Sequence, residues 1–375
     1  MRVTQARALP QTVLREATDR RLLDETIRQG RTTRAELADV TGYSRPTVSE
    51  AVRRLVGSGL LDATGLKETG RRGRVGTFYS LGARAGWVLG LELDQSGVHA
   101  RSADLAGRTL GDLRRPPTPP GDRDALVAGV RAAVGAVTGG EGPLRAVAVS
   151  IANPVDPLTH QTVPLAGTPF PEGLLSPGEM IGDLLPAPIL VDNDVNLAAL
   201  AEHRTGRAAG APSFAYVYVG AGLGVGLYLG DQLIRGAHGL AGEIGYLPGV
   251  NAPTLAGDLA SRGLARSDAP SNDVAALLRA LDDGDERILT VLADAVGRAI
   301  ISVAAVVDPA LVLLGGPVGT HPALLPRVRA GLAFPGPLEV EHGTLGTEAA
   351  LTGALHLAVE HARAAAVASG PGTRG

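Results

Sequence analysis

A helix-turn-helix pattern in the first 60 residues constrains the fold of this chain more than any other feature. Leu22, Leu23 and Ile27 recur at helical spacing. Gly30 ends that helix, and residues 33–36, Thr-Arg-Ala-Glu, read as a capping box that opens a second, short helix. The pattern therefore predicts a small helical module at the start of the sequence.

The third predicted helix has the layout of a recognition helix. It follows a turn at 41–43, Ser44 caps it, and Pro46 is tolerated in its first turn. Its apolar residues form one stripe at helical spacing: Val48, Ala51, Val52 and Leu55. The N-terminal residues of a recognition helix contact base edges in the major groove. We therefore expect DNA contacts from four residues off the stripe: Arg45, Thr47, Ser49 and Arg53.

An arginine-rich glycine turn follows this helix. Residues 70–76 read Gly-Arg-Arg-Gly-Arg-Val-Gly and lie in the tip 67–76, between predicted wing strands at 60–61 and 77–81. Dense positive charge on such a tip suits phosphate contacts and entry into a minor groove. We therefore expect three further arginines to contact DNA: Arg71, Arg72 and Arg74.

The charge is divided unevenly along the chain. Residues 1–80 contain 15 Lys+Arg and 9 Asp+Glu, a net charge of +6; because the whole chain carries −3, the remainder carries −9. A basic start and an acidic remainder indicate a nucleic-acid-binding module joined to a second body. The alternative is a three-helix module for protein interaction with a solvated arginine loop.

The composition excludes other classes of protein. There is no cysteine, so a disulfide framework and a thiolate metal site are impossible. The N-terminal residues lack the apolar stretch of a signal peptide. The uncharged segment 210–230 is long enough to suggest a membrane span, but its glycines and the run 215–219 favour a strand and a tight turn. We predict a cytoplasmic protein.

The body has the alternating pattern of an α/β fold. The whole chain has 375 residues, more than one core usually serves, so two or three domains are expected. Strands are predicted at 88–94, 98–104, 145–151 and 189–192, and helices at 124–137 and 197–204. Such alternation predicts a parallel or mixed sheet with helices on both faces.

Four segments of the body stand out in order. They are Val-Asp-Asn-Asp-Val-Asn at 191–196, Gly-Ala-Gly-Leu-Gly-Val-Gly at 220–226, Gly-Ala-His-Gly-Leu-Ala-Gly-Glu-Ile-Gly at 236–245, and 308–316, from Asp-Pro to Gly-Gly. With the winged helix, they resemble the ROK family of repressors, uncharacterised reading frames and sugar kinases, over essentially the whole chain. The resemblance implies a two-lobed actin-like ATPase fold with a sugar site between the lobes.

This resemblance sets the expected domains and site. We expect a winged helix-turn-helix over 1–81 and a ROK sugar-kinase-like domain over 82–375, whose lobes cross near 193–200 and whose C-terminal helix returns to the first lobe. The effector-binding residues it implies are Asn193, Asp194, Glu243 and Tyr246. Carboxylates and amides can form the hydrogen bonds that sugar hydroxyls require. In kinases of the family, the residue matching Asp194 is the general base. Taken singly, Asn193 and Asp194 could cap the following helix, Glu243 could be a surface charge, and 220–226 could be a plain hairpin.

Departures from the family's kinases argue against turnover. Residues 92–96 read Glu-Leu-Asp-Gln-Ser where those kinases carry Asp-x-Gly-x-Thr, and 152–156 read Ala-Asn-Pro-Val-Asp where Pro-Gly-Pro-Val-Asp is usual. Phosphoryl transfer depends on positioning and charge neutralisation, so we expect Asp194 to be a vestigial base. Tyr246 replaces a family histidine that ligates zinc, and 251–258 replace its cysteine-rich loop. We expect no enzyme activity, no cofactor and no metal.

The sequence therefore predicts a DNA-binding transcriptional regulator, a repressor of carbohydrate-related genes. Its partners would be a double-stranded DNA operator, a sugar or sugar-phosphate effector bound in a kinase-like cleft without turnover, and further copies of itself in a homodimer or homotetramer. Two alternatives remain open. One is an active ATP-dependent sugar kinase with a DNA-binding head, and the other is a regulator with a vestigial pocket.

Overall fold

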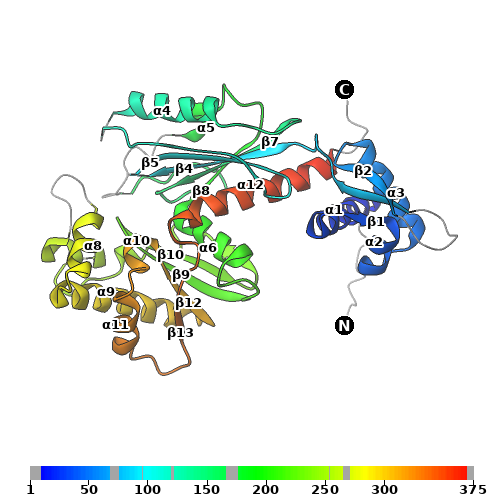
Figure 1. Cartoon of the computed structure of the whole chain (residues 1–375). Coiled ribbons are helices and arrows are strands. Elements are labelled where there is room, and N and C mark those ends of the chain that lie inside the picture. Colours follow the sequence, from blue (N-terminus) through cyan, green and yellow to red (C-terminus); the bar gives the residue numbers. More distant parts are fainter. Residues whose placement is uncertain are drawn as a thin grey trace, which may run out of the picture.

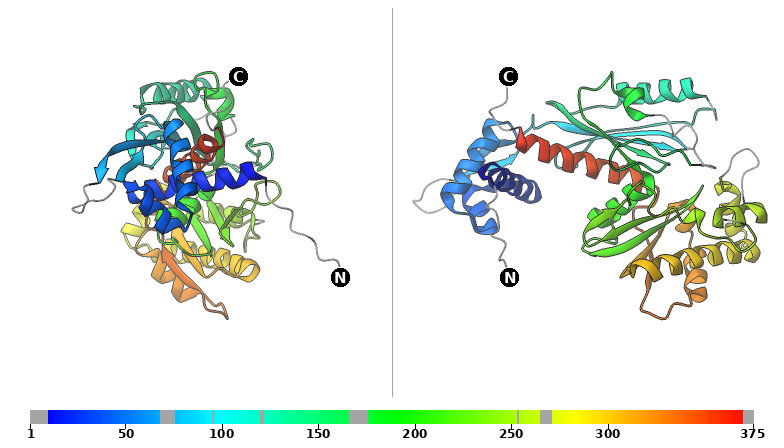
Figure 2. Two further views of the ribbon diagram at one scale, coloured as in Figure 1. Left: turned by 90° about the vertical axis from the view of Figure 1, so that its right-hand side faces the viewer. Right: turned by 180° about the vertical axis from the view of Figure 1, so that it is seen from behind.

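The computed structural model describes residues 10–67, 76–94, 96–119, 122–165, 176–252, 254–264 and 271–369. A small N-terminal module stands beside a larger body of two lobes, each built on a five-stranded sheet (Figure 1). The long helix α12 (Ala349–Ala368) runs from the junction between the lobes to the module, as both Figure 1 and Figure 2 show. The three parts are therefore linked by one continuous helix.

The N-terminal module has three helices and a three-stranded sheet. The helices are α1 (Gln11–Gln29), α2 (Arg34–Thr41) and α3 (Arg45–Gly57), and the strands are β1 (Thr32–Thr33), β2 (Leu61–Lys67) and β3 (Gly76–Leu81). Thr33 and Glu36 form the predicted capping box, and the Thr47 N–H donates to the Ser44 hydroxyl at 3.3 Å. The four residues of the predicted apolar stripe on α3 are buried in the core of the module. The sequence does not predict β1, since two residues carry no alternating pattern.

The first lobe is a mixed sheet in the order β6-β5-β4-β7-β8. Its strands are β4 (Trp87–Asp94), β5 (Gly97–Asp104), β6 (Thr109–Arg115), β7 (Leu144–Ile151) and β8 (Ile189–Asn193). Helices α4 (Arg123–Ala136) and α5 (Pro177–Ile181) cover one face and α12 the other (Figure 1). Because β4, β7 and β8 run parallel, their carboxyl ends meet at the junction between the lobes.

The second lobe is a sheet in the order β11-β10-β9-β12-β13. Its strands are β9 (Ser213–Val219), β10 (Leu223–Leu229), β11 (Gln232–Ile234), β12 (Leu311–Gly315) and β13 (Glu339–His342). Its larger helices are α6 (Asp194–Thr205), α8 (Val274–Asp282), α9 (Glu286–Val307) and α11 (Leu324–Gly331), with the shorter α7 (Leu255–Leu259) and α10 (Gly316–Gly319) between them. The uncharged segment 210–230 is the β9–β10 hairpin, as the sequence predicts.

Among the described helices, α9 has the length and composition that would allow it to cross a membrane. The most apolar part of this 22-residue helix has a mean hydropathy of 1.8, and 39% of that part is buried inside the protein. Leu292, Val296 and Ile300 form part of its inner face and lie in the core of the second lobe. The helix thus covers the face of the second sheet opposite α6.

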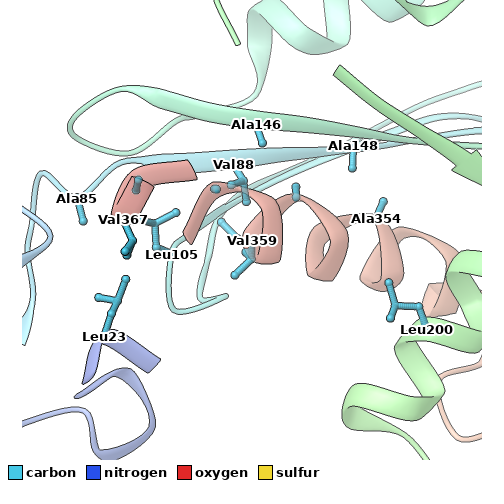
Figure 3. Close-up of a cluster of buried hydrophobic side chains, with 14 of the residues drawn as sticks. Leu23, Ala85, Val88, Leu105, Ala146, Ala148, Leu200, Ala354, Val359 and Val367 are labelled. Atoms are coloured by element: carbon cyan, nitrogen blue, oxygen red, sulfur yellow. The ribbon is translucent and has the colours of Figure 1, made fainter. Parts of the chain in front are cut away.

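The module packs directly on the body. Leu23 of α1, Val367 of α12 and Leu105 lie together in one hydrophobic cluster (Figure 3). At the same junction Arg363 donates to the Leu105 carbonyl at 2.7 Å and to Asp24 of α1 at 3.2 Å. The other end of α12 packs so closely on α6 that a Cβ on Gly353 would overlap the Leu197 carbonyl. A movement of α6 would therefore also move α12, the helix that packs against the module.

Candidate functional site

Acidic side chains from both lobes gather where the lobes meet. Glu92 and Asp94 lie near the end of β4, Asp194 begins α6, and Glu243 precedes the short 3₁₀ helix η2 (Ile244–Tyr246). We call these four carboxyl groups and their surroundings the inter-lobe site. Their mutual charge effects show that they share one electrostatic environment. Within the described ranges, no group of three or more His, Asp or Glu side chains is arranged to hold a metal ion.

The carboxyl groups of Glu92, Asp194 and Glu243 have a pKa well above that of a free carboxyl group. Burial is the main reason that the pKa of Glu92 is raised to about 8, and the charges of Asp94 and Asp194 raise it further. Burial also raises the pKa of Asp194 to about 7. A hydrogen bond that its Oδ1 accepts from the Val195 N–H at 2.8 Å acts in the opposite direction and lowers this pKa. Burial alone raises the pKa of Glu243 to about 7. At neutral pH these groups can therefore both donate and accept hydrogen bonds.

The predicted segment 236–245 holds Glu243 against the second sheet. Gly242 has a φ of +93°, and a Cβ there would overlap the Val225 carbonyl, so only glycine lets the segment lie this close to β10. The Val225 N–H donates to the Gly242 carbonyl at 2.8 Å. Tyr246 follows one turn later with 47% of its side chain exposed, and burial together with the charge of Glu243 raises its pKa. The charge of Glu243 thus acts on both Asp194 and Tyr246.

Asn193 has a structural task of its own. Helix α6 begins at Asp194, so the predicted start near Leu197 is wrong by three residues, because Asn193 provides the cap. Its Oδ1 accepts from the backbone N–H groups of Val195 and Asn196 at 3.0 and 3.2 Å. Its Nδ2 donates to the Asn153 carbonyl at 3.3 Å. The capping alternative is therefore what the structure shows for Asn193.

A buried ion pair beside the site was not predicted. Asp192 is 2% exposed, and its Oδ2 accepts from Nε and Nη2 of Arg235 at 2.8 and 2.5 Å. Asp192 is the penultimate residue of β8 in the first lobe, whereas Arg235 follows β11 of the second, so the pair joins the lobes two residues before Asp194. Asp192 adjoins the predicted Asn193-Asp194 pair, but nothing in the sequence indicates a partner 43 residues away.

Two tyrosines on β9 were also missed. Tyr216 and Tyr218 point from the same face of the strand toward the junction, where the charges of Asp194 and Glu92 reach both. Burial is the main reason that the pKa of each phenol is raised. The run 215–219 was recognised only as a strand, because a strand pattern does not show which residue meets the opposite lobe.

The predicted DNA-contacting residues on α3 lie off its buried stripe and differ in exposure. Arg45, Thr47 and Arg53 are exposed, and Ser49 is partly buried. The Thr47 hydroxyl lies 2.8 Å from the Ser44 hydroxyl, so it belongs to the helix cap as well. The wing arginines Arg71, Arg72 and Arg74 lie outside the described residues.

Two exposed arginines near the wing were not predicted. The Arg31 guanidinium lies 3.9 Å from the centroid of the Phe78 ring, and that of Arg34 lies 5.2 Å from the Tyr79 ring. Such contacts at exposed sites contribute about 0.5–1 kcal/mol. They add positive charge at the base of the wing, and the excess of arginine in residues 1–80 is the signal that could have pointed to them.

Comparison with known families agrees with this geometry. Residues 89–361 match the profile of the ROK family, and residues 15–62 match that of a winged helix-turn-helix DNA-binding domain. The chain belongs to the ROK family. The predicted fold class, a winged helix-turn-helix followed by a two-lobed ROK domain, is thereby confirmed.

Individual relatives include enzymes and regulators. The chain is 31% identical over 196 residues to the bifunctional enzyme NanE/NanK of Brucella melitensis, which covers 49% of this chain and 38% of that protein. It is 23% identical over 241 residues to the xylose repressor of Bacillus subtilis, which covers 63% and 62%. The chain thus spans less than two thirds of either relative. A ROK family transcriptional regulator, described as a homolog of the E. coli MLC protein, has a similar fold, with a TM-score of 0.69 at 18% identity over 95% of this chain and 100% of that one.

Proposed function

We propose that this chain is a transcriptional repressor of carbohydrate-related genes that binds a sugar-type effector at the inter-lobe site without phosphorylating it. The observation that carries the proposal is a winged helix with an exposed recognition helix, packed on a ROK body. The similarity to a xylose repressor and the fold shared with a ROK transcriptional regulator support it. In this proposal residues 1–81 bind DNA and residues 82–375 bind the effector, with the lobes crossing near 193–200.

DNA binding is assigned to α3 and the wing. Arg45, Thr47, Ser49 and Arg53 would read base edges in the major groove, and Arg71, Arg72 and Arg74 would contact phosphates or the minor groove. One winged helix makes a small interface, so specific binding needs two heads on half-sites about one helical turn apart. We therefore propose a cytoplasmic homodimer or homotetramer that forms through the body.

Effector binding is assigned to Asp194, Glu243 and Tyr246, with the side-chain amide of Asn193. Sugars present hydroxyls that both donate and accept hydrogen bonds, and carboxyl groups with a pKa of about 7 can match either role. A ligand that draws Asp194 and Glu243 together would favour one arrangement of the lobes. Because α12 packs on α6 at one end and on α1 at the other, that arrangement would set the position of the DNA-binding module.

The kinase alternative has one observation in its favour. A general base works best with a pKa near the working pH, and the pKa of Asp194 is about 7. The opposing argument comes from the first lobe. Glu92 stands where the family's kinases carry the aspartate that holds magnesium, and with a pKa of about 8 it is largely protonated at neutral pH. A protonated carboxyl group is a poor ligand for Mg²⁺, which supplies the positive charge that phosphoryl transfer needs, so we favour binding without turnover.

The proposal is tested with the full-length protein on DNA. Duplexes selected from a random library should share two half-sites, and binding measured by fluorescence anisotropy should weaken for Arg45→Ala. Addition of a panel of aldoses, N-acetylated amino sugars and their 6-phosphates should then change operator affinity for at least one compound, with no transfer of phosphate from ATP–Mg²⁺. Failure to enrich any DNA sequence would contradict the proposed regulator function. Phosphorylation of a sugar at an enzymatic rate would favour the kinase alternative instead.

A further inference from the structure

Two glycine turns lie side by side at the edge of the second sheet. Strands β9 and β12 are parallel neighbours, and they end at the turns 220–222 and 315–316. In α/β proteins, ligands bind beyond the carboxyl ends of parallel strands. Glycine-rich turns at that position expose backbone N–H groups, which bind phosphate oxygens. By general principles, a phosphate chain would therefore enter this protein between the two turns.

The space between the turns is taken by Tyr218. This residue pairs with Gly224 on β10 and with Gly315 on β12. A Cβ on Gly220 would overlap the phenol oxygen of Tyr218, and a Cβ on Gly316 would lie 2.8 Å from Cδ2 and Cε2 of the same ring. The glycines of both turns thus make room for an aromatic ring of the chain itself.

Tyr216 fills the next position along the strand. A Cβ on Gly315 would overlap its phenol oxygen. Tyr216 is only 2% exposed, whereas Tyr218 is partly buried and lies nearer the carboxyl groups of the inter-lobe site. Tyr218 is therefore the outer of two rings that line the edge of the sheet, and it is the one that an incoming ligand would meet.

The charges around Tyr218 also disfavour a phosphate. The charges of Asp194 and Asp94 act on its phenol, so an anion at this place would face both carboxylates. Three arginines of the described residues have carboxylate partners here: Arg235 binds Asp192, and Arg101 and Arg114 both bind Glu348. A phosphate would have to displace these partners or remain uncompensated.

We propose that Tyr218 is a specificity-determining residue, whose ring occupies the space between the glycine turns so that the site accepts an uncharged polyhydroxylated ligand and rejects nucleotides and phosphorylated sugars. This inference rests on the proposed function for the identity of the ligand, because it names which of the two effector classes fits. The exclusion of phosphate depends only on Tyr218 and its neighbours. The two parts can therefore fail separately.

The first test measures phosphate binding directly. ATP–Mg²⁺, inorganic tripolyphosphate and glucose 6-phosphate are titrated by calorimetry into the full-length protein and into two variants. Tyr218→Thr removes the ring and retains a residue that suits a strand, and Tyr218→Phe is the matched control that keeps the ring. We expect Tyr218→Thr to bind at least one of the three anions about tenfold or more tightly than the other two proteins do. Equal binding by all three proteins, or tight binding by the unchanged protein, would overturn the proposal.

The second test needs no ligand and holds even if a variant is less stable. Gly220→Ala should destabilise the protein when Tyr218 is present, because its methyl group overlaps the phenol oxygen. In the Tyr218→Thr background the same change should cost much less, which a double-mutant cycle from urea unfolding measures. Equal costs in both backgrounds would show that the ring lies elsewhere. Neither test uses DNA or a neutral sugar, so loss of DNA binding would contradict the proposed function and leave this inference standing.

Discussion

On one side of the inter-lobe site, Asp194, Glu243 and Tyr246 present carboxyl and phenol groups that suit the hydroxyls of a sugar. On the other side, Glu92 and Asp94 end a strand, and Tyr218 lies between the glycine turns. The two sides face the same junction, and in the proposed function only the second departs from what phosphoryl transfer requires. Recognition of a sugar needs a few well-placed hydrogen bonds, whereas transfer needs an open and charge-neutralised place for phosphate. One fold can therefore keep the first property and lose the second.

The largest expected effect is the pH dependence of stability, to which the two sides contribute separately. The pKa of Glu92 is raised from 4.5 to about 8, so the folded protein keeps a proton that the unfolded chain releases. Its contribution to stability is complete below about pH 4.5 and is lost as pH rises toward 8, at about 1.4 kcal/mol per pKa unit. Glu92→Gln should therefore flatten the decline in the free energy of unfolding between pH 5 and 8.

Glu243→Gln is the matched variant on the sugar side. Because the pKa of Glu243 is raised to about 7, this variant should remove a smaller part of the same decline. Urea unfolding at unit steps of pH measures both variants against the unchanged protein. Identical pH profiles for all three proteins would mean that neither carboxyl group is as buried as the structure indicates.

The next effect concerns the ion pair that joins the two sides. Arg235→Ala would leave Asp192, which is 2% exposed, without its charged partner and with only the hydrogen bonds from Asn193 and Asn196 to its Oδ1. Because the Arg235 side chain is 31% exposed, we expect a loss below the roughly 3–5 kcal/mol of a fully buried pair. Arg131→Ala is the control, since it breaks the exposed pair between Arg131 and Asp183, for which about 0–1 kcal/mol is expected. Chemical denaturation compares the two. Equal small losses would show that water reaches Asp192.

Local features could be predicted from the sequence, whereas contacts between the two sides of the inter-lobe site could not. The capping box at Thr33 and the buried stripe on α3 depend on residues within one or two turns, so spacing alone predicts them. The strand β6 was missed because it is an edge strand with exposed or half-buried positions throughout, and it shows no apolar alternation. The contact of Arg235 with Asp192, and that of Tyr218 with two separate turns, depends on how distant strands are ordered. The order of the strands in a sheet cannot be predicted from a local sequence pattern.

Ligand affinity should separate the two sides more directly. For any sugar that changes operator affinity, Asp194→Asn or Glu243→Gln should weaken binding about tenfold or more, since losing a charged hydrogen-bond partner costs about 1.5–3 kcal/mol. Glu92→Gln should leave affinity nearly unchanged, because that group is already largely neutral at pH 7. Calorimetry on the three variants decides the matter. A loss confined to Glu92→Gln would place the sugar on the opposite side from the one proposed.

The smallest effects are expected on DNA, far from both sides of the site. Arg45→Ala should relax sequence preference by about 1–3 kcal/mol at the base pair it contacts. The double change of Arg71 and Arg72 to Ala should weaken binding to all sequences and lower the dependence on salt by about one unit of slope per lost phosphate contact. Anisotropy titrations at several salt concentrations, on an operator and on a single-base variant of it, separate the two results.

Arg123→Ala is the control for the DNA-binding changes, because this exposed arginine lies on α4 of the first lobe. Changing it alters the net charge of the protein without touching the module, so neither sequence preference nor salt slope should move. A salt slope that falls equally in this variant would mean that the body itself contacts DNA. An unaltered slope in the double wing variant would instead exclude Arg71 and Arg72 from phosphate contact and leave α3, Arg74 and the arginines at the base of the wing, Arg31 and Arg34, as the DNA-contacting residues.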